Sequence, residues 1–193
     1  MRTDLKPFFA LLLLLTTLAS CTEDNVPKPE ESPLFTFFDE PNIAIDTTPV
    51  AATIWEYGFE FNPIVSGKIS KLGVKLPTTG TFIVRLWRLY GNGAPTVITE
   101  RVVTVNTAHE PTFTDINPVF FGANDPLAVT VLANSFYRIS KQDGSDFTFP
   151  QEVGNIAITS FKEATNTTGM AMLPATKNST TVAPCVNVVF VAD

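Results

Sequence analysis

Glu56 and Glu60 are the first candidates for chemistry in this sequence. They stand four positions apart among alternating aromatic residues, a spacing that puts both carboxylates on one face of a β-strand. Two facing carboxylates are the acid and base of most glycosidases. The next apolar stretch carries Lys71 and Lys75 at the same spacing, and ion pairs between neighbouring strands explain the glutamates more simply. We therefore expect no carboxylate-pair catalysis.

The chain has only one histidine and two cysteines, which leaves few residues for histidine or cysteine chemistry. His109 precedes Glu110 in a connection that ends at Pro111, and we expect it to be an exposed loop residue. No second histidine or cysteine cluster can complete a zinc site. Cys185 opens an apolar C-terminal stretch, which predicts a buried, unreactive thiol. These residues predict neither an enzyme nor a bound cofactor.

Two acidic turns could supply oxygen ligands to Ca²⁺. They are Asn124-Asp125 and Asp143-Gly144-Ser145-Asp146. Neither has the ligand spacing of a known calcium loop, and Asp, Asn, Gly and Ser are the ordinary residues of tight turns. We expect turns and no metal site.

Arg85, Trp87 and Tyr90 are the candidate ligand-binding residues. If Val84 and Leu86 point into the core, strand alternation turns Arg85 and Trp87 outward, near the loop that contains Tyr90. An exposed tryptophan beside tyrosine and arginine is typical of a sugar-stacking platform or of a protein-binding hot spot. The alternative is that both strand faces are covered and Trp87 packs under a loop or the C-terminal segment.

Two alternating stretches, 55–61 and 71–76, must position these residues. As an antiparallel hairpin they would set Glu60 opposite Lys71 and Glu56 opposite Lys75. The aromatic face of the hairpin would then be buried. We predict this hairpin. The alternative sends the two strands into different sheets, with Pro63–Gly67 as an arch between them.

The rest of the chain predicts an all-β domain. Short β-rich stretches, beginning at 34–38, alternate with Gly, Pro and Asn turns, and no long window has helical periodicity. We expect one antiparallel β-sandwich of jelly-roll or immunoglobulin-like type over residues 34–193, with about nine or ten strands.

The order of motifs resembles the β-sandwich family catalogued as domain of unknown function 4082. The resemblance covers roughly residues 42–142 and leaves 147–193 outside it. It implies a sandwich of secreted proteins, often found beside carbohydrate-handling or adhesion modules, and no established activity. Four strings carry it: Glu56-Tyr-Gly-Phe-Glu-Phe61, Gly67-Lys-Ile-Ser-Lys-Leu-Gly-Val74, Phe82-Ile-Val-Arg-Leu-Trp87 and Asn134-Ser-Phe-Tyr-Arg-Ile-Ser140.

The N-terminus has the pattern of a secretory signal peptide. Arg2 and Lys6 precede an apolar run over residues 8–18, which is too short to span a bilayer as a helix. Leu18-Ala19-Ser20-Cys21 then resembles the lipobox of bacterial lipoproteins. The resemblance implies cleavage after residue 20 and a Cys21 that carries acyl chains such as palmitate. Several acyl chains on one residue give stable membrane anchoring.

Residues 21–33 predict a flexible tether, because they are rich in proline and acidic residues and poor in apolar ones. Glu23-Asp24 resembles the export signal that sends lipoproteins of Bacteroidetes-type bacteria to the outer face of the outer membrane. The alternative is an ordinary linker and a periplasmic location. Asp46-Thr47-Thr48 resembles the O-glycosylation site of the same bacteria, with Thr47 as acceptor, and the alternative is a plain turn threonine.

Charge excludes one class of partner. Signal-peptide removal changes the formal net charge from −6 to −7, and an acidic chain with few basic clusters does not suit nucleic acid. We expect a surface-anchored, non-catalytic binding or adhesion module, with glycans as the first class of ligand to consider. The alternative is a structural or accessory subunit of a cell-envelope assembly that has a protein partner.

Overall fold

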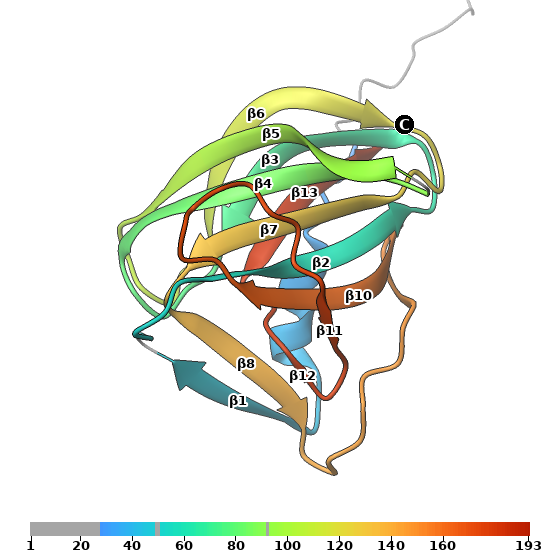
Figure 1. Ribbon diagram of the computed structural model, residues 1–193. Coiled ribbons are helices and arrows are strands. Elements are labelled where there is room, and N and C mark those ends of the chain that lie inside the picture. Colours follow the sequence, from blue (N-terminus) through green and yellow to red (C-terminus); the bar gives the residue numbers. More distant parts are fainter. Residues whose placement is uncertain (1–27, 49–50, 92) are drawn as a thin grey trace, which may run out of the picture.

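The computed structural model describes residues 28–48, 51–91 and 93–193 and forms an antiparallel all-β sandwich (Figure 1). The expected signal peptide, Cys21 and the tether as far as residue 27 lie outside the described residues. Within the described part, no helix has the length and apolarity needed to cross a membrane. The elements are η1 (Pro33–Asp39, 3₁₀), β1 (Ile43–Thr48), β2 (Trp55–Pro63), β3 (Gly67–Val74), β4 (Gly80–Tyr90), β5 (Gly93–Val105), β6 (Thr112–Phe121), β7 (Leu127–Ala133), β8 (Phe136–Lys141), β9 (Gln151–Val153), β10 (Ile156–Thr165), β11 (Thr176–Asn178), β12 (Thr181–Val182) and β13 (Val186–Ala192).

Three sheets build the sandwich. The large sheet has the order β11-β10-β2-β7-β4-β5, with β9 also paired to β10. The second sheet is β13-β3-β6, and the third is β1-β8-β12. In Figure 1 the large sheet faces the viewer, the second sheet lies behind it, and β1 and β8 lie at the bottom. We call the face of the large sheet turned away from the core its outer face.

The core between the two larger sheets follows from strand alternation. Tyr57, Phe59 and Phe61 point inward from β2 and are at most 2% exposed. From the opposite sheet, β3 and β13 contribute aliphatic residues and Phe190, all buried. Removing these side chains from water is the main stabilising term, at about 2 kcal/mol or more for each large one.

The predicted hairpin of β2 with β3 is wrong. β2 pairs with β10 and β7, whereas β3 pairs with β13 and β6. Glu60 instead forms an ion pair with Lys162 of β10 at 2.6 Å, and Lys71 forms one with Glu30 at 2.9 Å. Residues 64–66 are therefore an arch between sheets. The arch lets the apolar faces of both strands meet across the core, whereas a hairpin would put them on the same side.

The predicted first strand at 34–38 is a 3₁₀ helix, η1. Pro33 occupies its first turn, and Leu34 and Phe37 are both fully buried. A 3₁₀ helix has three residues per turn, so residues three apart share a face. Phe37 packs edge-on against Phe161 of the large sheet, with ring centroids 5.4 Å apart.

The domain begins before Leu34, earlier than the expected boundary. Glu31 forms an antiparallel bridge with Phe190 of β13, and its carboxylate accepts hydrogen bonds from Asn155 N and Nδ2 at 2.7 and 2.6 Å. Together with the Lys71–Glu30 ion pair, these contacts attach the end of the expected tether to the sandwich.

The described residues contain thirteen strands, more than the nine or ten expected. Three of them, β9, β11 and β12, have only two or three residues each. β6 also continues through Pro118, which a strand at the edge of a sheet tolerates. Residues 147–193, outside the family resemblance, supply β10 to the large sheet and β13 to the second sheet. They are integral to the domain.

Candidate functional site

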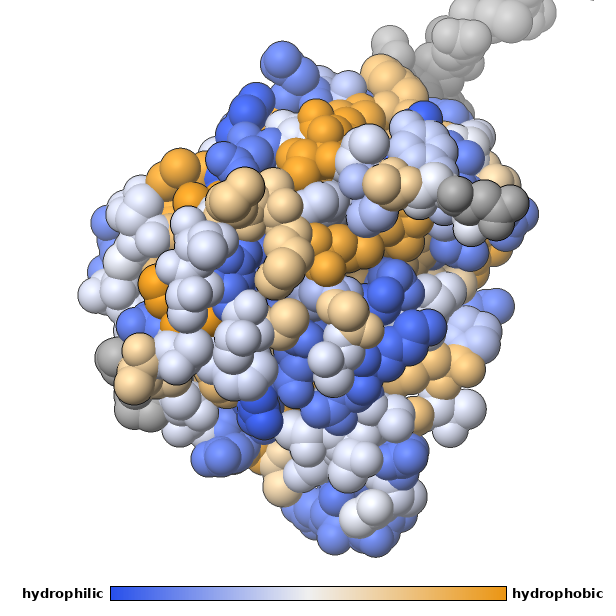
Figure 2. Space-filling model, in the orientation of Figure 1, coloured by the Kyte–Doolittle hydropathy of each residue, from blue (hydrophilic) through white to orange (hydrophobic). Residues whose placement is uncertain are grey.

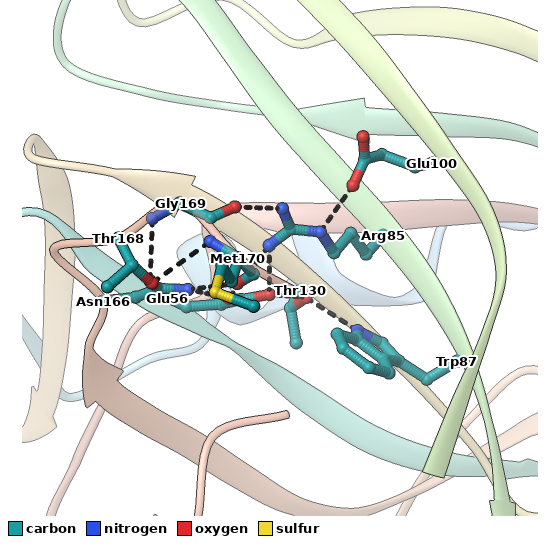
Figure 3. A network of polar contacts seen from close by, with 9 residues as sticks. All are labelled: Glu56, Arg85, Trp87, Glu100, Thr130, Asn166, Thr168, Gly169 and Met170. Carbon is teal, nitrogen blue, oxygen red and sulfur yellow. Dashed lines mark hydrogen bonds and ion pairs between the residues drawn. The ribbon is translucent and has the colours of Figure 1, made fainter. Parts of the chain in front are cut away.

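Arg85 of β4 is the centre of a buried polar network on the outer face of the large sheet (Figure 3). Strand pairing places Glu100 and Thr130 on either side of it. Its Nε donates to Glu100 at 2.7 Å, and its Nη1 donates to both carboxylate oxygens of Glu56 at 3.0 Å. Its Nη2 donates to the Gly169 carbonyl at 2.8 Å. One guanidinium thus connects β2, β4, β5 and the β10–β11 connection.

Glu56 is fully buried, contrary to the expectation that it faces solvent. Besides Arg85, its carboxylate accepts hydrogen bonds from Thr130 Oγ1 at 2.8 Å and Asn166 Nδ2 at 2.6 Å. A buried carboxylate is tolerated only when paired and hydrogen-bonded, as this one is. Alternation correctly put Glu56 on the outer face, but it gave no information about what covers that face.

The pKa of Arg85 is raised from its ordinary value. Burial alone would lower it, and the hydrogen bonds and charges of Glu100 and Glu56 outweigh burial. The guanidinium is therefore charged at all accessible pH values. All three guanidinium nitrogens already donate hydrogen bonds within the fold, so the network holds structural elements together. We call Arg85, its partners Glu56 and Glu100, and the Glu56 partners Thr130 and Asn166 the clamp.

The clamp holds residues 166–170, which we call the Asn166 loop. Asn166 Nδ2 also donates to the Met170 carbonyl at 2.8 Å, and Asn166 Oδ1 accepts from Gly169 N at 3.0 Å. Gly169 has φ 71°, a conformation that favours glycine, and a β-carbon there would lie 3.9 Å from Leu132 Cδ2. The loop therefore packs on the outer face and leaves Met170 72% exposed.

The predicted exposed platform is absent, because two of its three residues are buried. Trp87 is 3% exposed, and its indole Nε1 donates to Thr130 Oγ1 at 2.8 Å. Arg85 is 2% exposed. Tyr90 is half exposed, at the end of β4. The alternative, that Trp87 is covered, is confirmed.

A groove of about 220 Å³ lies beside the Asn166 loop, at the opposite end of β4 from Tyr90. Ile54, Ile83 and Leu132 form its apolar walls. Two contacts place the Asn166 loop beside the groove. Gly169 lies close to Leu132, and Asn166 N donates a hydrogen bond to the Ile54 carbonyl at 2.9 Å. The remaining lining residues are Thr81, Phe82, Ala133 and Asn134.

Apolar surface extends beyond the groove. Val102 of β5 lies beside Ile83 in the pairing register and is 55% exposed. In Figure 2, which shows the outer face, strongly apolar surface lies mainly in the upper half of the view. The outer face therefore combines aliphatic patches with a polar clamp.

The groove and the Asn166 loop were not predicted from the sequence. Asn-Thr-Thr-Gly at 166–169 has the composition of a turn, but composition does not say which surface a turn covers. Asn166 is 110 residues from its partner Glu56, and nothing in their local spacing indicates the contact.

The remaining candidates lie apart from this site. His109 is exposed, as predicted, and its Nδ1 shares a hydrogen bond with the Tyr137 hydroxyl. Asp143 accepts hydrogen bonds from Ser145 N and Oγ, which lower the pKa of its carboxyl. Asp125 accepts from Gly122 N. Both acidic segments thus make turn contacts, and among the described residues no group of three His, Cys, Asp or Glu is placed to hold a metal.

Cys185 is a buried free thiol, and burial raises its pKa to about 12. Thr47 lies exposed in strand β1 and not in a turn. Its backbone N–H donates to the Asp46 carboxylate at 2.8 Å. O-glycosylation of Thr47 and lipidation of Cys21 stay predictions.

No family model, curated protein or solved structure matches the chain. The resemblance to domain of unknown function 4082 therefore stays a prediction.

Proposed function

We propose that this protein is a lipid-anchored, non-catalytic binding module of the bacterial cell envelope. The groove on its outer face would take an apolar side chain of a protein partner. The observation that supports this proposal is a clamped loop beside an open aliphatic groove. The clamp orders the loop without any ligand, and a site ordered in advance loses less entropy on binding.

The lining of the groove favours a protein over a glycan. Sugars stack on exposed aromatic rings, and Phe82, the single aromatic residue of the lining, is 7% exposed. The walls are Ile54, Ile83 and Leu132, with Met170 and Val102 exposed nearby. Methionine and aliphatic residues are typical of surfaces that bind other proteins. The volume is below the roughly 300–1,000 Å³ of small-molecule sites, so it suits one protruding side chain.

The anchor part of the proposal rests on the sequence around Cys21. Growth with a labelled fatty acid should label the wild-type protein and leave a Cys21→Ser variant unlabelled. Equal labelling of both would contradict lipidation at this residue. Protease treatment of intact cells would test the outer-face location: degradation supports it, and full protection with an intact outer membrane contradicts it.

The binding part is tested with isolated cell envelopes from a strain that lacks the protein. We expect saturable binding of the purified lipoprotein, lost in Ile54→Glu and retained in Ile45→Glu. The two isoleucines are similarly exposed, 41% and 49%, but Ile45 lies on β1, outside the groove. Protease pretreatment of the envelopes should abolish binding. Binding that survives protease and disappears after polysaccharide removal would instead show a glycan ligand.

A further inference from the structure

Four exposed apolar side chains lie at the same end of the sandwich, opposite the groove. Ile64 and Val65 belong to the arch. Tyr90 is the last residue of β4, and Phe120 is the second-last residue of β6. Their exposed fractions are 38%, 37%, 50% and 66%. We call this surface the arch end. Water-exposed aromatic and aliphatic groups in one place mark an interaction surface more often than scattered ones do.

Backbone contacts hold the arch end together. Asn124 N donates to the Pro63 carbonyl at 2.7 Å, and Leu89 N donates to the Pro126 carbonyl at 2.9 Å. Phe120 lies opposite Lys68 in the β3–β6 register, next to the arch. Figure 1 shows the ends of β2 and β6 and the C-terminus on the same, upper right side of the molecule.

The N-terminal segment enters the domain at this same end. Glu31 pairs antiparallel with Phe190, so the residues before it run toward Asp193. Asp193 N in turn donates to the Ser66 carbonyl of the arch at 2.9 Å. Lys28, the first described residue, is exposed. The chain from the expected anchor therefore arrives at the arch end and not at the groove.

The connection to the anchor is short. Six residues lie between Cys21 and Lys28, and the seven steps from one to the other span at most about 25 Å when fully extended. The arch end must therefore stay close to whatever membrane holds Cys21. The groove, at the far end of β4, lies about 30 Å beyond Tyr90 along an eleven-residue strand.

The composition of the arch end suits a lipid surface. Tyrosine and phenylalanine with lysine and arginine are typical of membrane–water interfaces, where apolar groups enter and long cationic chains reach the headgroups. Lys28, Lys68 and Arg88 lie here, and the Arg88 guanidinium is 5.5 Å from the centre of the Phe121 ring. Asp125 and Asp193 offset part of this positive charge, so contact would depend on apolar insertion more than on anionic lipid.

We infer that the arch end rests on the lipid bilayer that holds Cys21, with Phe120 and Val65 entering the headgroup layer and the groove facing away. This inference rests on the lipid anchor of the proposed function. It adds an orientation that an anchor alone does not supply, because a tethered domain could otherwise tumble freely.

Single-cysteine labelling tests the inference on the mature lipoprotein, reconstituted in vesicles of three parts phosphatidylethanolamine to one part phosphatidylglycerol. Cys185 is buried and Cys21 would be acylated, so an introduced cysteine is the reactive one. Phe120→Cys and Val65→Cys would carry a fluorophore sensitive to polarity, and Ile45→Cys on β1 is the matched exposed control. At positions 120 and 65 we expect the fluorophore emission to shift to the blue and to be quenched by nitroxide lipids, and both effects should persist at high salt. At position 45 we expect neither effect.

Other outcomes would overturn the inference. Protein that floats with the vesicles but shows the same spectra at all three positions would be anchored and free to tumble, which contradicts the contact and leaves the anchor intact. Protein that fails to float would contradict the anchor and the contact together. Shielding of position 120 that appears only together with cross-links between copies of the lipoprotein would show a protein interface in place of a lipid one.

Discussion

At the residue scale, the outer face depends on Arg85, whose three nitrogens hold Glu56, Glu100 and the Asn166 loop. Glu56 is fully buried, and the Glu100 side chain is 47% exposed. The same cation therefore has one carboxylate partner in a low-dielectric site and one in water. Their energetic contributions should differ strongly.

Glu56→Gln should lower the free energy of unfolding by about 3 kcal/mol, because it leaves a buried guanidinium without its enclosed counter-charge. The matched variant Glu100→Gln should cost about 1 kcal/mol or less, as exposed ion pairs do. Urea unfolding followed by tryptophan fluorescence measures both. Equal losses in the two variants would contradict the clamp.

Cys185 predicts an alkaline loss of stability. The unfolded thiol ionises near its ordinary pKa of 9.0, whereas burial keeps the folded thiol neutral up to about 12. The contribution of the neutral thiol to the free energy of unfolding is therefore complete below pH 9. It is lost as pH rises toward 12, at about 1.4 kcal/mol per pH unit. Burial also raises the pKa of Tyr57, which acts in the same direction.

Comparison of wild type with Cys185→Ala isolates the thiol, because Tyr57 is common to both. The fall in unfolding free energy between pH 9 and pH 11 should be smaller in the variant. The native thiol should also resist a disulfide reagent at pH 8 until urea unfolds the protein. Rapid reaction of the folded protein would contradict the buried position.

Sequence alone predicted part of this chemistry. The inward face of β2 and the buried Cys185 follow from alternation and apolarity. The burial of Glu56 does not, because its partner Asn166 comes 110 residues later in the chain. Alternation assigns a side chain to a face and says nothing about what lies on that face.

At the element scale, strand positions were predictable and strand partners were not. The predicted stretch at 55–61 lies within β2, and the predicted stretch at 71–76 overlaps β3. The predicted pairing of Glu60 with Lys71 joins opposite charges, but Lys162 of β10 is also a lysine and forms the ion pair with Glu60 in the structure. Charge matching between strands is worth only about 0.2–1 kcal/mol, too little to select one partner among several.

A double-mutant cycle distinguishes the arch from the hairpin. Glu60→Gln and Lys162→Met should show a coupling energy of about 1 kcal/mol, because the two side chains are 2.6 Å apart and largely buried. Glu60→Gln and Lys71→Met should be additive, since Lys71 pairs with Glu30. Coupling in the second cycle and additivity in the first would favour the hairpin.

The Asn166 loop should lose its fixed position in Asn166→Ala. This substitution removes the hydrogen bonds to Glu56 and to Met170, and we expect a loss of about 2 kcal/mol in stability together with weaker envelope binding. The control Thr167→Ala changes an exposed neighbour and should leave both unchanged. Amide hydrogen exchange at Gly169 and Met170 should accelerate in the first variant alone.

At the scale of the whole molecule, two surfaces, the groove and the arch end, lie at opposite ends of one sandwich. The chain enters at the arch end, and the groove lies at the other end of β4 and β7, beside the loop that the clamp holds. An anchored domain in this orientation presents its groove away from the bilayer, where an envelope protein can reach it. The fold class was predictable from sequence, but this polarity was not, because it depends on which strand ends meet.

Photo-cross-linking in intact cells tests the central claim most directly. A photoreactive amino acid would replace Ile54 at the groove or Ile45 on β1. We predict a discrete protein adduct from position 54 that disappears when Ile83→Glu is added, and no such adduct from position 45. Equal adducts from both positions, or an adduct from position 54 that consists only of polysaccharide, would contradict the assignment of the groove to a protein partner.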